Sequence, residues 1–310
     1  MPFVGTSFAE SSRKLILGIS IPAEIAELAK FSSITSAMHI KIVPAILFIL
    51  SYWNPLTAQE SDLDRTTFCP DHFTFVRIVY DSVGGNGEAY YQGDSGWIPR
   101  WATDHPVGAR NLTLRLNQLT TIKANRGTLL LRASDPQLLN YAFAFMSDPG
   151  WQELSRDEET GLKRFLDNGG FLWVDDFWGQ AEWDNFESNM KRVAPNWKWF
   201  DIPQDHPIMS TVYPMKKCPQ ITAIQFYRRN GVSYDPAWIH KRPNGGDADL
   251  SQVHFRGLSD DSGRLVAVAT HNTDIADGWE REGDDEEFFK RFSIDAYALA
   301  INVLTYAMSH

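Results

Sequence analysis

From Phe73 onwards, runs of apolar residues with the period of a strand alternate with segments that have the period of a helix. Residues 73–80, FTFVRIVY, alternate between apolar and polar positions, and residues 109–120 carry leucines on one helical face. Residues 128–132, TLLLR, and 141–146, YAFAFM, are two more strand-like runs. The pattern predicts a strand, a helix and two further strands.

Residues 155–179, SRDEETGLKRFLDNGGFLWVDDFWG, contain one complete helix and strand unit. Ser155 and Glu158 have the spacing of a capping box, and Asn168 followed by two glycines is typical of a helix end. Residues 171–174 are continuously apolar, which predicts a buried strand. An acidic and aromatic loop begins directly after it.

The second half of the chain continues this alternation less regularly. Residues 183–193 are amphipathic and predict a helix that ends before Pro195. Residues 221–227 and 264–270 predict strands, and residues 286–308 predict a last helix. Strands that alternate with helices favour an α/β domain with one doubly wound, mainly parallel sheet of the flavodoxin-like kind.

The amino-terminal part, residues 1–58, has a different pattern. Residues 38–58, MHIKIVPAILFILSYWNPLTA, have a short basic start, an apolar run and a small residue at the end, which resembles a secretory signal peptide. The unbroken apolar run is shorter than the roughly 18 residues of a spanning helix, so the alternative is an uncleaved anchor that extends beyond it. We expect translation to start at Met38. The alternative is that residues 1–37 form an ordinary, poorly ordered amino-terminal tail. Residues 59–310 should form one α/β domain, exported to the periplasm or medium or tethered to the membrane.

Composition narrows the class of partner. The 310 residues are 43% hydrophobic, enough for a sizeable core, and the formal net charge is -10, which argues against nucleic acid. We expect a ligand or an envelope protein as partner, and membrane contact only through an uncleaved amino-terminal segment. The acidic run at residues 281–287, REGDDEE, lacks the pattern of a calcium loop. The SVGGNG at residues 82–87 lacks the ending of a P-loop, so no cofactor is expected.

Several separated motifs occur together in the same part of the chain. They are FVRIVY, WATDHP, LRASDP, YAFAFM, GGFLWVDDFWG, DHPI and HNTDIADGWE. With them, the chain from about Phe73 to its end resembles the bacterial family called domain of unknown function 4159. The resemblance implies a fold similar to class I glutamine amidotransferases and to trehalose-utilisation-like proteins, and exported or membrane-tethered relatives. It implies no settled activity.

Glutamine amidotransferases carry a cysteine nucleophile on a sharp turn after a central strand, beside a histidine. In this chain the comparable loop begins Asp175-Asp176, and neither Cys69 nor Cys218 lies in such a turn. Amidotransferase chemistry is therefore not expected. The two cysteines are either free or joined by one disulfide, which an exported protein could form.

The loop after residues 171–174 lies where ligands bind in open α/β sheets. Neighbouring residues of a strand face opposite sides, so only one of Asp175 and Asp176 joins a pocket, and Asp176 is preferred because Trp178 follows it. Its carboxylate could bind a metal, act as a base or grip sugar hydroxyls while the indole stacks on the ring. Alternatively, either aspartate caps the next helix or binds loop amides.

Two histidines lie in compact polar loops next to aspartates, His206 beside Asp205 and His271 near Asp274. With Asp176, these histidines are the candidates for catalysis. A pair of histidines and a carboxylate would suit zinc or iron, but no short HExxH-like spacing is present, so no metal is expected. The alternative is that both histidines make structural hydrogen bonds.

Further polar and aromatic residues are candidates for ligand binding. Arg77 lies within the first predicted strand, where burial calls for a carboxylate partner such as Asp104 or Asp176. Tryptophans could line a carbohydrate cleft or fill the core; those concerned are Trp97, Trp101, Trp178 and Trp279. The expected ligand-binding set is Arg77, Trp101, Asp104, Asp175, Trp178, Asp274 and Trp279.

Two functions remain open on this evidence. The first is a non-catalytic envelope module that lacks the amidotransferase nucleophile and binds a ligand or partner. The alternative is a hydrolase acting on a glycan or another envelope polymer, with Asp176 as base or metal ligand and a histidine assisting. A catalytic function requires the side chains of Asp104, Asp176, His206 and His271 to lie close together around one open pocket.

Overall fold

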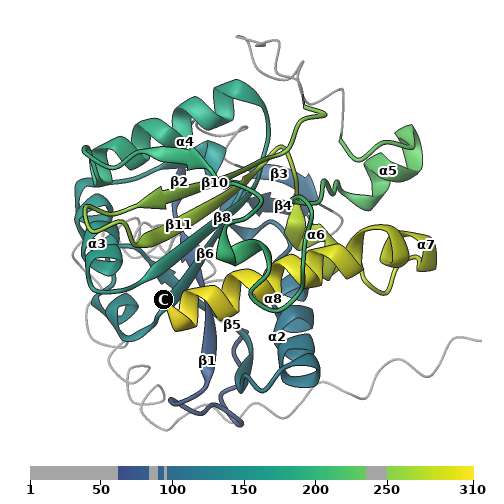
Figure 1. Cartoon of the computed structure of the whole chain (residues 1–310), viewed down its shortest axis with the longest axis horizontal. Coiled ribbons are helices and arrows are strands. Elements are labelled where there is room, and N and C mark those ends of the chain that lie inside the picture. The colour runs from purple at the N-terminus through teal and green to yellow at the C-terminus, as the bar shows by residue number, and fades with distance from the viewer. Residues whose placement is uncertain (1–61, 84–89, 94–95, 235–249) are drawn as a thin grey trace, which may run out of the picture. The chain divides into compact units, whose positions relative to one another are not determined.

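A computed structural model describes residues 62–83, 90–93, 96–234 and 250–310 (Figure 1). The predicted extension at residues 1–58, its signal-like segment at residues 38–58 and the start at Met38 lie outside the described residues. The assignment of residues 59–310 to one domain stays a prediction. In the part of the chain that the structure describes, no helix has both the length and the apolar character to cross a membrane.

Seven strands form the main sheet in the order β5-β1-β6-β8-β11-β10-β9. The parallel strands are β1 (Phe73–Val79), β5 (Ala124–Arg132), β6 (Phe143–Ser147), β8 (Phe171–Phe177) and β11 (Leu265–His271). Antiparallel pairing adds β10 (His254–Ser259) to β11 and β9 (Trp199–Asp201) to β10. Taken in chain order, the parallel strands lie 2-1-3-4-5, which is the flavodoxin-like arrangement. The predicted α/β class is confirmed.

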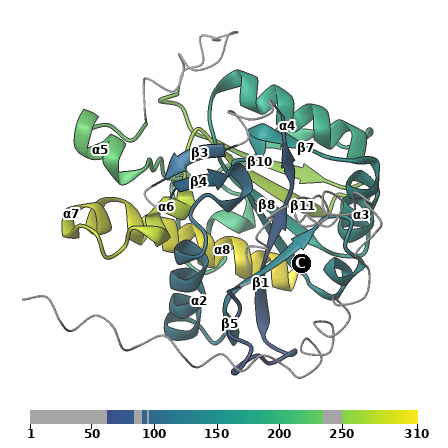
Figure 2. The same cartoon turned by 180° about the vertical axis from the view of Figure 1, so that it is seen from behind.

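Helices cover both faces of this sheet (Figure 1 and Figure 2). Alternate strand residues point to opposite faces, so Phe75 packs with α2 (Val107–Leu119), α6 (Ile275–Glu280) and α8 (Ile294–Ser309). Its neighbour Val76 packs on the other face with α3 (Arg156–Asp167) and α4 (Gly179–Val193). The sheet is therefore buried on both sides, and its strand ends are left to form a site.

The capping box predicted for α3 is present. The Ser155 hydroxyl accepts a hydrogen bond from the Glu158 N–H at 3.3 Å, and the Glu158 carboxylate accepts one from the Ser155 N–H at 2.9 Å. The predicted last helix is divided into α7 (Glu286–Phe288), a π-helical turn at Phe289–Ser293, and α8. Among the described residues, short 3₁₀ segments at Arg100–Ala102 (η3), Pro136–Asn140 (η4), Pro149–Trp151 (η5) and Pro207–Met209 (η6) connect other elements.

The strand predicted for residues 221–227 is wrong, because this segment contains helix α5 (Ile224–Asn230). A carboxylate oxygen of Asp277 accepts a hydrogen bond from the Ile224 N–H at 3.0 Å, and Gly231, with a φ of 69°, ends the helix. Ile221, before the helix, and Ile224, in its first turn, are buried in the core, so the apolar run reflects two anchoring residues and not a sheet strand.

Residues 81–100, expected to be a loop, contain short strands. β2 (Asp81–Ser82) pairs with β7 (Gln152–Glu153), and β3 (Tyr90–Gly93) forms a hairpin with β4 (Gly96–Pro99). Strands β9 and β10 were likewise not predicted from the sequence. These differences all lie outside the parallel part of the sheet.

Candidate functional site

The candidate site lies at the carboxyl-terminal edge of the parallel strands. The chain passes from β1 to β5 on one side, whereas β6 lies on the other side of β1, so the topology switches between β1 and β6. Ligands of open α/β sheets bind at such a switch point. Asp176 is the last residue but one of β8, Asp274 follows the neighbouring strand β11, and Asp104 comes from the loop between η3 and α2.

Three aspartates from these separate segments converge. Asp104, Asp176 and Asp274, which we call the acidic site, each offer a carboxylate oxygen that lies within 4.8 Å of those of the other two. Asp104 belongs also to a second set of the same size with Asp277 and Glu280. The carboxyl group of Asp104 therefore belongs to both sets of acids.

A sharp turn at the end of β8 places Asp176. Its φ of 60° lies in the left-handed region, one residue before β8 ends at Phe177 and three residues before α4 begins at Gly179. Strained backbone where a strand gives way to a helix presents the nucleophile in α/β hydrolases. The position carries a carboxylate here, as the sequence predicted, and not a cysteine.

Fixed donors orient two of the three carboxylates. The indole Nε1 of Trp178 donates to Oδ1 of Asp176 at 3.0 Å, and the Asp277 N–H donates to Oδ1 of Asp274 at 2.9 Å. Asp104 differs, because its Oδ2 is buried and accepts no hydrogen bond while the residue as a whole is only 6% exposed. A buried carboxylate oxygen without a donor is costly unless a ligand compensates it.

Burial and mutual repulsion raise the pKa of each carboxyl of the acidic site. The pKa of Asp104 rises because of burial and the charges of Glu280 and Asp176, with Arg77 opposing. The pKa of Asp176 rises through burial and the charges of Asp148 and Asp175. For Asp274 the causes are burial and the charges of Asp104 and Asp176. The acidic site is thus poised for a cationic or hydroxyl-bearing ligand.

Arg77 shapes the loop that carries Asp104. Its Nη1 donates to the carbonyl oxygens of Trp101 at 3.0 Å and Thr103 at 2.5 Å, immediately before Asp104. Its hydrogen bonds to these two carbonyl oxygens give this buried arginine a positioning role beside the acidic site, and its charge acts on Asp104.

Asp175 follows the structural alternative considered for it. One of its oxygens accepts from the Thr270 hydroxyl at 2.5 Å, and the other from the Ala276 N–H at 2.9 Å, in the first turn of α6. Burial raises its pKa to about 7, although the hydrogen bond from Thr270 opposes the shift. Asp175 thus anchors α6, whereas Asp176 belongs to the acidic site.

The two predicted histidines bond elsewhere. His271 lies between the rings of Phe177 and Trp183, with its Nε2 3.0 Å from the Gly179 carbonyl oxygen. Burial and the charge of Arg256 lower its pKa to about 3, so its ring is neutral. His206 begins η6, where its Nδ1 accepts from the Ile208 N–H at 3.2 Å. Neither ring joins the acidic site.

The three tryptophans of the expected ligand-binding set separate into two groups. Trp178 is half-buried and bonded to Asp176. Trp101 and Trp279 are buried, and the ring of Trp279 packs on Trp173 and Phe145 in the core. Of these, only Trp178 is placed to contact a ligand at Asp176.

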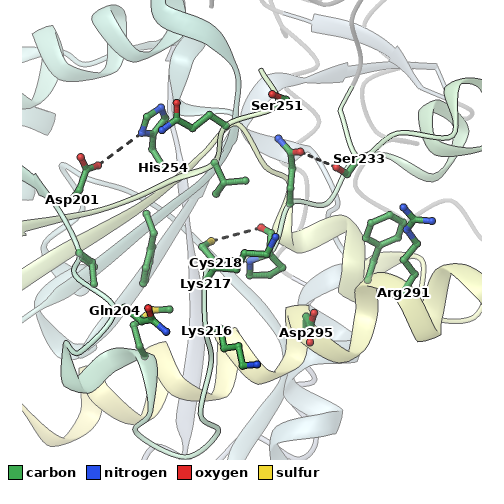
Figure 3. Close-up of a pocket in the computed structure, with 18 residues that line it drawn as sticks. Asp201, Gln204, Lys216, Lys217, Cys218, Ser233, Ser251, His254, Arg291 and Asp295 are labelled. Carbon is green, nitrogen blue, oxygen red and sulfur yellow. Dashed lines mark hydrogen bonds and ion pairs between the residues drawn. The ribbon is translucent and has the colours of Figure 1, made fainter. Parts of the chain in front are cut away.

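A cavity of about 690 Å³ lies beside β9 and β10, next to the start of α8 (Figure 3). No residue of the acidic site lines it, and no buried, unbonded polar atom among the described residues does so. Cys218 lines it as a free thiol whose pKa burial raises well above the ordinary value, which disfavours the reactive thiolate. Cys69 is also free. The acidic site is therefore the better candidate.

Sequence reasoning overlooked two acids of the second set. Asp277 and Glu280 follow Asp274 at intervals of three residues, which places all three on one side of the helix that begins there. The signal was present in HNTDIADGWE, but the segment was not identified as a helix.

Comparison of the sequence with curated proteins finds no match. Among protein families, residues 89–308 match Domain of unknown function (DUF4159), a span that includes every residue of the acidic site. Because this match covers more than half of the 310 residues, the chain belongs to the DUF4159 family.

Proposed function

We propose that this domain is a non-catalytic binding module of the cell envelope, and that its acidic site contacts a polar ligand or a group on a partner protein. The observation that carries the proposal is Asp176. It lies near the end of β8 with a φ of 60°, and carboxylate oxygens of Asp104 and Asp274 lie within 4.8 Å of one of its own. This arrangement presents acceptors for hydroxyl or cationic groups in place of a nucleophile.

The envelope location is part of this proposal. It is supported by the signal-like segment at residues 38–58 and by the family resemblance. Export would bring the acidic site into contact with glycans and envelope proteins, and membrane contact would be limited to an uncleaved amino-terminal segment.

A hydrolase acting on a glycan or another envelope polymer is the second candidate. It is favoured by the half-buried Asp176, because a raised pKa suits a general acid and Trp178 could stack on a sugar ring. A histidine that assists Asp176 is not favoured, because His271 is hydrogen-bonded to the Gly179 carbonyl and His206 to the Ile208 N–H. Asp104 would have to act as the second catalytic carboxyl.

Thermal unfolding of the full chain tests the proposal, with sugars, polyols, amines and cell-wall fragments added one at a time without metal. We expect at least one ligand to raise the unfolding temperature of the wild type but not that of Asp176→Asn. Asp184→Asn, an exposed change on α4, is the matched control and should keep the shift.

An identical shift in Asp176→Asn, or no shift with any ligand, would overturn the binding role. Release of new reducing ends from a stabilising glycan, abolished by Asp176→Asn, would select the hydrolase instead.

A further inference from the structure

We propose that the acidic site holds one oxygen-preferring divalent cation of the calcium type, with Asp104, Asp176 and Asp274 as its protein ligands. This inference rests on the proposed function, because it names what the three carboxylates hold.

The spacing of the oxygens fits such an ion. The three carboxylate oxygens lie within 4.8 Å of one another. Calcium binds oxygen at roughly 2.3–2.6 Å in flexible geometry, so oxygens within 4.8 Å of one another are close enough for one ion to bridge two of them. Magnesium demands near-ideal octahedral geometry and usually keeps several waters, so a site built from protein carboxylates suits calcium better. A set made only of carboxylates also favours calcium over zinc, which prefers histidine and cysteine.

Asp104 supplies a second, independent observation. Its Oδ2 is buried without a hydrogen bond, although the residue is only 6% exposed. An oxygen of this carboxyl group lies within 4.8 Å of oxygens of Asp176 and Asp274, and the same limit holds towards Asp277 and Glu280. A cation would satisfy the buried oxygen directly.

The distribution of positive charge distinguishes the two acidic sets. Glu280 and Asp277 pair with the Nε of Arg281, at 2.9 and 3.7 Å. Within residues 62–83, 90–93, 96–234 and 250–310, no lysine or arginine lies at ion-pair distance from Asp104, Asp176 or Asp274, although the charge of Arg77 acts on Asp104. Arg281 thus pairs directly with Asp277 and Glu280, whereas a cation in direct contact with the acidic site would be an external ion.

The hydrogen bonds of the ligands also suit metal binding. Trp178 fixes one oxygen of Asp176, and the Asp277 N–H fixes one oxygen of Asp274. The second oxygen of each is left for the ion, and donors of this kind commonly orient metal-binding carboxylates.

Terbium luminescence tests the inference on the full chain, because Tb³⁺ replaces calcium and emits when a nearby indole such as Trp178 transfers energy to it. We expect saturable emission with one ion per chain, reversed by Ca²⁺ at lower concentration than by Mg²⁺. Asp104→Asn and Asp274→Asn should each weaken binding about tenfold or more. The exposed control Asp184→Asn should bind as the wild type does.

Absence of saturable emission would overturn the cation site. So would unchanged affinity in Asp104→Asn and Asp274→Asn, since the ion would then bind another acidic segment such as residues 281–287. Circular dichroism of each variant in chelator establishes that it is folded.

The inference and the proposed function fail separately. An organic ligand that stabilises the metal-free chain through Asp176, without any terbium binding, would leave the function and remove the cation. If terbium binds but no organic ligand stabilises the chain, either with or without Ca²⁺, the cation site would stand and the proposed function would be overturned.

Discussion

At the scale of single residues, two of the three aspartates of the acidic site have an unusual backbone conformation. Asp104 and Asp176 have φ values of 62° and 60°, in the left-handed region that costs energy for any residue with a side chain, and nearby Asp148 has a φ of 51°. Aspartate tolerates this region better than most residues. The charge of Asp176 raises the pKa of Asp104, and the charge of Asp148 raises the pKa of Asp176. Strain and repulsion at the same place are expected of a binding site.

Acidification tests the burial of His271. Its Nε2–H donates to the Gly179 carbonyl, Nδ1 faces Arg256 at 3.3 Å, and the ring of His254 stacks on it. The pKa of about 3 lies below the ordinary value of 6.5, so the unfolded chain binds the proton more readily. The stability contributed by the neutral ring is therefore present above about pH 6.5 and is lost as the pH falls towards 3.

We expect the free energy of unfolding in urea to fall by up to about 1.4 kcal/mol per pH unit from this group alone. His271→Gln should remove this part of the slope between about pH 6 and pH 4. Equal slopes in both proteins would show that His271 is not held neutral.

At the scale of elements, short helix α6 connects the core to the acidic site. Asp175 accepts from the Ala276 N–H and Asp274 from the Asp277 N–H, so two carboxylates hold its first turn. Gly278 lies against α8, where there is no room for a side chain. The position of Asp274 therefore depends on the packing of α6 on α8.

Gly278→Ala tests this packing. A Cβ at Gly278 would lie 2.5 Å from the Cβ of Ala296 and 3.2 Å from Cδ1 of Ile221, so α6 has to move. We expect the free energy of unfolding to fall by about 1–3 kcal/mol and binding at the acidic site to weaken. Gly283→Ala, where a Cβ meets nothing within 4 Å, should stay within about 0.5 kcal/mol of the wild type. Equal stability of the two variants would contradict the close packing.

The local sequence pattern was sufficient to predict those helices and strands whose defining residues lie within the element itself. Helix α3 has its capping box, and β8 has an unbroken apolar run. Helix α5 was mistaken for a strand because its start depends on Asp277, more than 50 residues away in the chain. Strands β9 and β10 form by pairing at the sheet edge, and such tertiary contacts override local propensity.

At the scale of the whole molecule, strand order assembles the acidic site. Asp104, Asp176 and Asp274 were each predicted as candidates because each lies in a polar loop, and the 2-1-3-4-5 order brings these loops to one edge. The sequence could not predict that His271 stays apart. Strand parity directs its ring to the face covered by α4, whereas the left-handed turn decides where Asp176 lies.

The central claim is that the carboxylates of the acidic site serve a ligand and not the stability of the fold. The most direct measurement is the free energy of unfolding of Asp104→Asn and the wild type, in chelator at neutral pH. Asparagine tolerates the left-handed backbone, so the change replaces one carboxylate oxygen by an amide NH₂ group and removes the negative charge without adding backbone strain.

Because Oδ2 of Asp104 is buried without a donor among other acids, we predict that Asp104→Asn is more stable than the wild type by about 1 kcal/mol or more. A variant less stable than the wild type would contradict the account, since Asp104 would then hold the fold together.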